Sequence, residues 1–216
     1  MPKTCPRWYR QPRSWRCSLG GDEGIRPLGT RRVLSTDVIG QDALDAARRG
    51  EAEGLEFLFH ELATPLATFA DRRGATDPEG LANATLFRAF NALAGFDGEY
   101  PQFCSYVYRT ARNLLIDEYR RKTRRPEVVD LAAAGPSISL SQTEDEVAGQ
   151  DWLNQMLAQL TVDQRDVILL RVIGDQSLQH TADVLGKPVS AVKALQRRAL
   201  RRLHTLTEEE GHTCTH

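Results

Sequence analysis

The 216-residue chain is 41% hydrophobic and 26% charged with a formal net charge of −1, which suits a globular protein with one or two modest cores. Its longest uncharged apolar run is far shorter than the roughly 18 residues of a membrane span, and no signal-peptide-like apolar segment follows the basic N-terminus. We therefore expect a cytoplasmic protein. Four irregularly spaced cysteines form neither a disulfide framework nor a paired metal motif, so reduced thiols are expected.

Charge is strongly segregated along the chain. Basic side chains gather in residues 1–35, again in 109–125 and again in 193–202, whereas residues 127–163 contain acidic side chains and neither Lys nor Arg. Like-charged blocks of this kind favour several contacts with a polyanion, separated by an acidic spacer.

The N-terminal part divides into an arm and a helical region. Residues 1–35 contain repeated Pro and Gly and no sustained helical period, which predicts a disordered basic arm. Over residues 42–69, apolar side chains recur at spacings of three and four, with expected interruptions at Gly50 and Pro65.

Two further helices are predicted before residue 125. Residues 77–94 start with an N-cap Asp and a Pro at the first helical position, followed by an apolar repeat. Residues 100–122 place apolar side chains on one side and cationic or amide side chains on the other, although Ile116 and Glu118 fall on the wrong faces.

After Pro126 the chain is acidic, poor in large apolar residues and broken by Gly and Pro, which predicts a flexible linker. The helical period resumes at residue 151, with Thr161 as the cap of a second helix. With no convincing strand pair, the predicted class is all-α, with two small helical domains. The predicted segments are the arm 1–35, a domain 36–125, the acidic linker 126–150, a domain 151–208 and a C-terminal tail 209–216.

Residues 177–203 fit a helix-turn-helix. A helix starts at Ser177, the small Ala182 lies where two helices cross closely, Gly186 occupies the turn, and Val192 and Leu195 anchor the second helix. The free face of that helix combines small side chains with long cations, which suits entry into the DNA major groove. An ordinary solvated basic face is the alternative, but the preceding turn favours DNA contact. The DNA-binding candidates are Ser190, Lys193, Ala194, Arg197, Arg198 and Arg201.

Three stretches, in this order and spacing, resemble one family. DPEGLANATLFRAFNAL is similar to a core-binding helix, YPQFCSYVYRTARNLLIDEYRRKTRR to a promoter-melting and −10-reading segment, and LAQLTVDQRDVILLRVIGDQSLQHTADVLGKPVSAVKALQRRALRRL to a −35-reading domain. These are the parts of the extracytoplasmic-function (ECF) subgroup of the sigma-70 family of bacterial RNA polymerase sigma factors, which keeps only the sigma-2 and sigma-4 domains. The resemblance covers about residues 40–206.

The resemblance implies a role for each part. The first helix would dock on the polymerase through Asn83, Phe87 and Arg88, although Gly80, Asn83 and Ala84 stand where the family usually has acidic and amide side chains. The loop 96–102 would capture a flipped base, and the following helix would contact the −10 element. We expect Phe103 and Tyr108 to belong to the core. The implied −10 contacts are Asp97, Glu99, Tyr100, Arg109, Arg112, Asn113 and Arg120.

The resemblance also implies partners. The acidic linker would lie within the polymerase and imitate nucleic acid, unless it is an inert spacer. The expected partners are RNA polymerase core enzyme and promoter DNA, for a chain that is monomeric away from core; whether an anti-sigma factor restrains it is left open. No cofactor and no catalytic residue are implied, because the chain lacks a phosphate-binding Gly loop, a zinc-protease motif and a nucleophile elbow.

Other interpretations stay open. The chain is alternatively a stand-alone helix-turn-helix regulator, which would bind paired half-sites as a dimer. The terminal His212, Cys214 and His216 are a weak candidate for a transition-metal site, in which Cys5 and Cys17 of the arm would join a redox or zinc sensor. The arm itself either grips DNA or polymerase or is a translated extension upstream of a later start codon.

Overall fold

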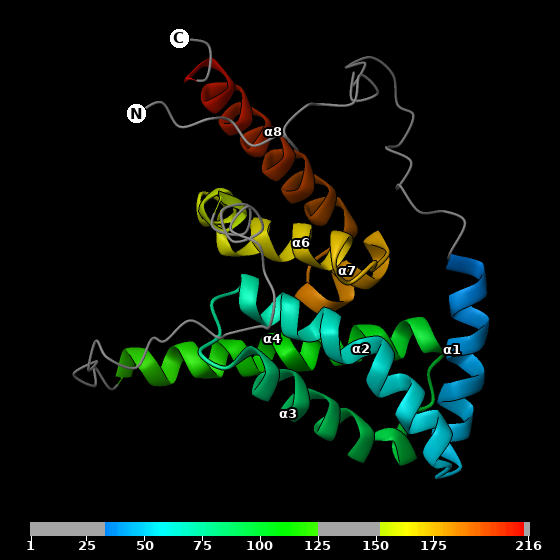
Figure 1. Ribbon diagram of the computed structural model, residues 1–216. Coiled ribbons are helices and arrows are strands. Elements are labelled where there is room, and N and C mark those ends of the chain that lie inside the picture. Colours follow the sequence, from blue (N-terminus) through cyan, green and yellow to red (C-terminus); the bar gives the residue numbers. More distant parts are fainter. Residues whose placement is uncertain (1–32, 125–151, 214–216) are drawn as a thin grey trace.

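The computed structural model describes the backbone of residues 33–124 and 152–213, and the side chains of residues 38–124 and 152–208. These residues form helices and turns without a strand, which confirms the all-α class (Figure 1). The predicted acidic linker, the terminal metal-site candidates and nearly all of the predicted arm lie outside the described residues.

The first helical unit contains α1 (Val33–Arg48), α2 (Ala52–Arg72), α3 (Pro78–Asn91), the short 3-10 helix η2 (Leu93–Gly95) and α4 (Tyr100–Arg124). A break at Gly50, whose φ is +81°, separates α1 from α2 as the sequence predicts. The predicted interruption at Pro65 is wrong, because α2 continues through it. Pro65 leaves the carbonyl of the exposed Glu61 without its helical donor, on a side of α2 that water reaches.

Local capping sets the start of α3. The Asp77 carboxylate accepts a hydrogen bond from the backbone N–H of Gly80 at 2.9 Å, and Pro78 occupies the first helical position, which confirms the predicted N-terminus. The helix ends at Asn91, earlier than the predicted residue 94, and the chain tightens into η2 before the turn that leads to α4.

The core of this unit is aromatic and aliphatic. Phe69 of α2 and Tyr108 of α4 stack edge to face with ring centroids 5.5 Å apart, and both are almost completely buried. Phe103, five residues before Tyr108 on α4, is fully buried as well. The expectation that Phe103 and Tyr108 belong to the core is confirmed.

The second unit contains a helical segment at residues 152–158, then α6 (Val162–Val172), α7 (Leu178–Leu185) and α8 (Val189–Thr213). A capping box joins Thr161 and Gln164 at the start of α6, which confirms the predicted cap. Ser177 Oγ accepts from the His180 N–H at 3.0 Å, and Gly186 ends α7 in the left-handed region at a φ of +62°. The predicted helix-turn-helix is therefore present as α7, its turn and α8.

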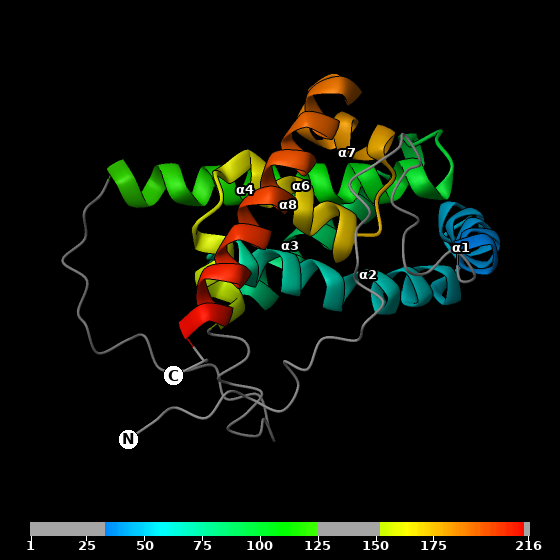
Figure 2. The ribbon, with the colours of Figure 1, turned by 90° about the horizontal axis from the view of Figure 1, so that it is seen from above.

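The two units pack against each other, and one apolar cluster runs through both. Helix α7 lies along α4, and α6 contacts α2, so the second unit covers one side of the first (Figures 1 and 2). This arrangement brings residues from both units into direct polar contact.

Candidate polymerase and nucleic-acid surfaces

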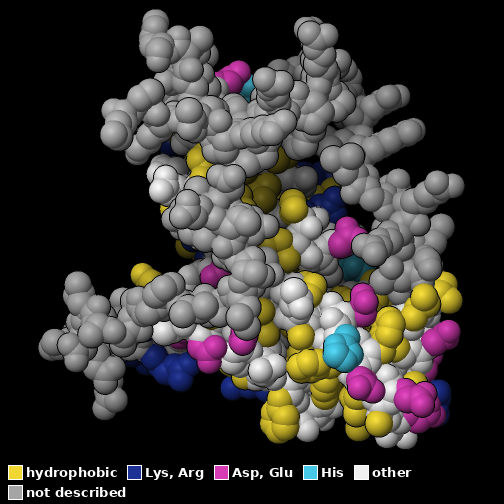
Figure 3. All heavy atoms as spheres, in the orientation of Figure 1, with side chains coloured by type: hydrophobic (Ala, Val, Ile, Leu, Met, Phe, Trp, Pro, Cys, Tyr) yellow, Lys and Arg dark blue, Asp and Glu magenta, His cyan; other side chains and the backbone are white. Residues whose placement is uncertain are grey.

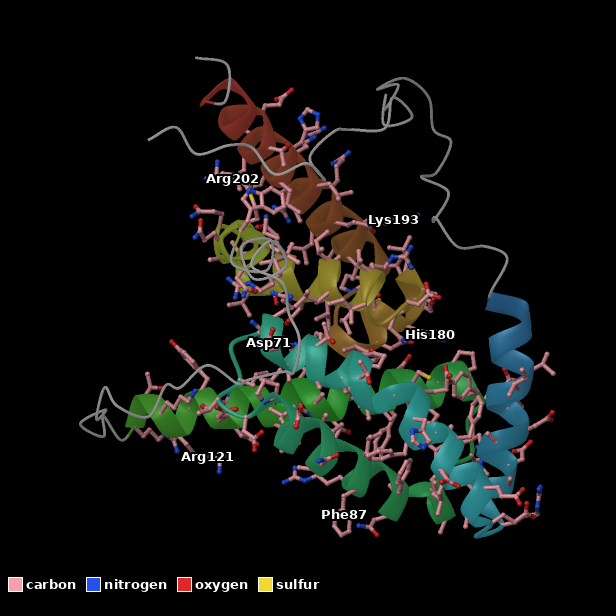
Figure 4. The ribbon with its side chains drawn as sticks, in the orientation of Figure 1. Asp71, Phe87, Arg121, His180, Lys193 and Arg202 are labelled. Atoms are coloured by element: carbon pink, nitrogen blue, oxygen red, sulfur yellow. The ribbon has the colours of Figure 1, made fainter. Side chains whose placement is uncertain are left out.

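The outer face of α3 presents the three residues that the sequence predicts for polymerase binding. Asn83, Phe87 and Arg88 are all exposed, whereas Leu86 and Ala89 on the opposite face are buried. The ring of Phe87 is 69% exposed and points away from the protein (Figure 4). A large aromatic side chain held in water by a rigid helix is typical of a protein-binding surface.

A basic hollow of about 400 Å³ lies between α3 and the C-terminal half of α4. Figure 3 shows cationic side chains gathered at this end of the first unit. Because Arg88 reaches this hollow from α3, it belongs to the same surface as the α4 cations as well as to the Phe87 face. The sequence alone places Arg88 and Arg120 on separate surfaces, because the hollow forms only where two helices meet. The hollow is lined by Arg88, Leu114, Asp117, Arg120, Arg121 and Arg124.

The loop before α4 has two exposed acidic side chains and one buried ring. Asp97 and Glu99 are exposed, but Tyr100 is only 6% exposed, with its ring packed against Gly40 of α1. A Cβ atom at Gly40 would lie 2.5 Å from that ring, so glycine is needed for this close approach. The structure therefore gives Tyr100 a packing position and not the solvent-facing position that base capture requires.

Contacts that the sequence did not reveal hold this loop in place. The N–H of Tyr100 donates to Gln41 Oε1 at 2.8 Å, and Arg48 donates to the carbonyl of Gly98. The Arg48 guanidinium also lies 5.7 Å from the ring centroid of Phe96. The partners in these two hydrogen bonds are 59 and 50 residues apart in the sequence, and no local motif marks such pairs.

The cationic side of α4 is split between solvent and the second unit. Arg109, Asn113 and Arg120 are exposed and lie along one face of the helix. Arg112 borders that face but is only 18% exposed, and its Nε donates to Asp166 Oδ2 of α6 at 3.0 Å. One of the predicted −10 contacts is thus already occupied within the chain.

Asp166 is the centre of a buried charge cluster between the two units. Its side chain is 0% exposed, and Arg73 Nε lies 2.6 Å from its Oδ1, without the alignment of a hydrogen bond. Burial raises the pKa of Asp166, and the guanidinium groups of Arg73 and Arg112 act in the opposite direction. Burial likewise lowers the pKa of Arg165, and the nearby charge of Arg73 adds to this effect.

Helix α8 presents the predicted −35 surface to solvent. Val192 and Ala199 are fully buried against the rest of the unit, which fixes the orientation of the helix. Figure 4 shows Lys193 and Arg202 on α8, away from the first unit. Ala194 is half-buried at the edge of the surface. The exposed members of the predicted −35 set are Ser190, Lys193, Arg197, Arg198 and Arg201.

Neither a metal site nor a membrane span is present among the described residues. The side chains described for residues 38–124 and 152–208 contain no group of three or more arranged to hold a metal ion. Cys104 is a buried, reduced cysteine in the core of the first unit. In the same part of the chain, no helix combines the length and apolarity that crossing a membrane requires.

Two family profiles match the two units separately. The profile described as Sigma-70 region 2 matches residues 58–125, and the profile described as Sigma-70, region 4 matches residues 150–203. The first therefore covers α3 and α4, and the second covers the helix-turn-helix.

Curated relatives and a solved structure agree with these matches. The chain is 26% identical to the ECF RNA polymerase sigma factor BldN of Streptomyces coelicolor, over 79% of this chain and 66% of BldN. It is 31% identical to the ECF RNA polymerase sigma factor SigW of Bacillus subtilis, over 54% of this chain and 68% of SigW. The matched parts thus span about two thirds of these relatives. A structure of CnrH in complex with the cytosolic domain of CnrY has the same fold, with a TM-score of 0.60 at 23% identity, over 79% of this chain and 97% of that chain.

Proposed function

The chain belongs to the ECF group of the sigma-70 family, and we propose that it binds RNA polymerase core enzyme and directs transcription from promoters by recognising their −10 and −35 elements. The observation that carries this proposal is the pairing, in one chain, of a region 2 unit with an exposed apolar and cationic surface and a region 4 unit with a solvent-facing helix-turn-helix. Such a subunit selects the promoter and performs no reaction of its own. Its place of action is the cytoplasm, where the polymerase works.

We assign polymerase binding to the outer face of α3. Phe87 supplies a large apolar contact, and Asn83, one turn earlier, supplies a hydrogen-bonding amide on the same face. The departures from the family pattern at Gly80 and Ala84 leave this face with few charges, so the apolar contact dominates.

We assign the −10 element to α4 and the loop before it. Arg109, Asn113 and Arg120 offer cations and an amide to phosphates and base edges. Asp97 and Glu99 are the exposed loop candidates for contact with an unstacked base. Arg112 joins this surface only when it is released from Asp166, and Tyr100 would need to leave its packing position.

We assign the −35 element to the exposed face of α8, with Lys193 and Arg197 nearest to the base edges and the remaining cations on phosphates. The acidic segment 126–150 is proposed to lie inside the polymerase between the two DNA-binding units. CnrH, which has the same fold, forms a complex with the cytosolic domain of CnrY, and an anti-sigma partner is proposed for this chain as well.

In vitro transcription tests this proposal against the stand-alone regulator. With purified core RNA polymerase from the same bacterium and a library of promoter fragments, the chain should give transcripts that neither core alone nor the chain alone produces. A stand-alone regulator would instead bind duplex DNA tightly without core and would yield no core-dependent transcript.

A further inference from the structure

The described arrangement of the two units is too compact for the proposed promoter contacts. The −10 and −35 elements are named for positions about 25 base pairs apart, which is about 85 Å along B-form DNA. Arg112 touches Asp166 of α6, and α6 packs directly on α8. The two proposed DNA surfaces therefore lie within about one long helix of each other, on the order of 40 Å.

We infer that this arrangement is a self-restrained state, held by a latch in which Asp166 of the second unit binds Arg73 and Arg112 of the first, and that the units separate before the chain engages a promoter. We call this compact arrangement the closed state. The inference rests on the proposed function, because the closed state keeps the proposed −10 and −35 surfaces too close together. Residues 125–151 connect the units, and a chain of that length reaches about 90 Å when extended, so the covalent connection permits the separation.

The latch is specific because its carboxylate is fully buried and its two arginine side chains are mostly buried. Arg73 is the C-cap residue just after α2, and Arg112 lies in the middle of α4. Their guanidinium groups converge on a single carboxylate that water does not reach. Arg165 adds a third cation close to Arg73. Without the Asp166 charge, these cations would repel one another in a poorly solvated interface between the two units. The closed state therefore depends on that carboxylate.

Neighbouring contacts show that the interface between the two units is closely packed. Ser105 Oγ of α4 donates to Gln176 Oε1 at 3.0 Å, and both side chains are buried. The Tyr108 ring packs against Gly174, where a Cβ atom would lie 3.0 Å from the ring. Arg72 Nη1 also donates to Asn154 Oδ1 across this interface at 2.6 Å.

The latch also competes directly with DNA. Arg112 cannot hold Asp166 and a promoter phosphate at once, so closure removes a cation from the proposed −10 surface. The α8 surface stays exposed in the closed state, which means that restraint acts through the first unit and through the distance between the units.

Two variants, one in each unit, test the latch in the full chain. Asp166→Asn keeps the size of the side chain and removes its charge, and Arg73→Gln removes a cation from the other side while leaving α6 unchanged. Asp183→Asn is the matched control, because Asp183 is an exposed α7 carboxylate whose described partner is Gln179 of the same helix. None of these residues belongs to the proposed DNA or polymerase surfaces.

The measurements are the radius of gyration from small-angle X-ray scattering and the affinity for purified core polymerase. Asp166→Asn and Arg73→Gln should each raise the radius of gyration by about 5 Å and strengthen core binding roughly tenfold, while Asp183→Asn matches the wild type. Unchanged radii in both latch variants would overturn the inference, and so would expansion in Asp166→Asn alone, because the effect would then belong to α6. Wild-type transcription with core, measured in parallel, tests the proposed function separately.

Discussion

Replacement of Arg197 by alanine should weaken recognition of the −35 element without weakening the fold. Arg197 is exposed on α8, and no hydrogen bond or ion pair to another described residue holds its side chain. The backbone orientation is set instead by the buried Val192 and Ala199. Arg197→Ala therefore leaves the core intact, and its effect is limited to the contacts that the guanidinium makes with DNA.

The expected size follows from the kind of contact. A bidentate contact between an arginine and a guanine edge contributes about 1–3 kcal/mol of discrimination, which corresponds to roughly 5- to 150-fold in affinity. Arg202 provides the control on the same helix, since five residues turn it by about 140° from Arg197. Arg202→Ala removes an equal charge from another face of α8.

The assay is transcription with core polymerase from promoters with an intact or a scrambled −35 element. Arg197→Ala should lose activity on the intact promoter and little on the scrambled one, whereas Arg202→Ala should behave alike on both. Equal losses for the two variants on both templates would show that α8 acts only as a general cationic surface, and the assignment of Arg197 would be refuted.

Three other outcomes are expected. Phe87→Ala should weaken core binding about thirtyfold, because Phe87 would be a buried aromatic anchor in the complex. The control is Phe59→Ala on α2, where Phe59 is 40% exposed, and it should leave the affinity unchanged. Equal affinities of the two variants in competition binding would show that α3 is not part of the polymerase surface. Gly186→Ala should destabilise the second unit by about 1 kcal/mol in thermal unfolding, because its φ of +62° is strained for alanine. Burial raises the pKa of the Tyr108 phenol, and the acidic neighbours Cys104 and Asp175 add to this effect. The closed state thus binds the phenolic proton more tightly, and its stability should fall as pH rises above about 10; scattering that shows no expansion at alkaline pH would contradict this.

The features that the sequence predicted correctly are those with local causes. The Asp77 cap, the Thr161 capping box and the Ser177–Gly186 boundaries of α7 depend on residues within four positions of one another. Hydrophobic periodicity likewise placed Phe103 and Tyr108 in the core. The exposed face of α8 follows from the same period.

The features that the sequence did not predict depend on distant partners. Glu118 lies on an apparently wrong face of α4 because its carboxylate accepts from the N–H and hydroxyl of Thr76, at 3.0 and 2.6 Å. Desolvation alone would raise its pKa, but these bonds and the nearby Lys122 lower it. The pairing of Arg112 with Asp166 is of the same kind, since helical periodicity marks Arg112 only as a polar position and says nothing of what it meets.

Arg112 connects the proposed function with the inferred restraint. An arginine on the −10 surface must be free to meet a phosphate, and a free chain that already offered such a surface would bind DNA non-specifically through the same charge. Pairing Arg112 internally with a buried carboxylate withdraws one cation from this surface, while Arg109 and Arg120 stay exposed. Burial raises the pKa of Asp166, so desolvation of this carboxylate opposes the attraction between the charges. A partner that binds the separated units more tightly than the closed state shifts the chain toward separation, and a polymerase that engages both units at once is suited to this role.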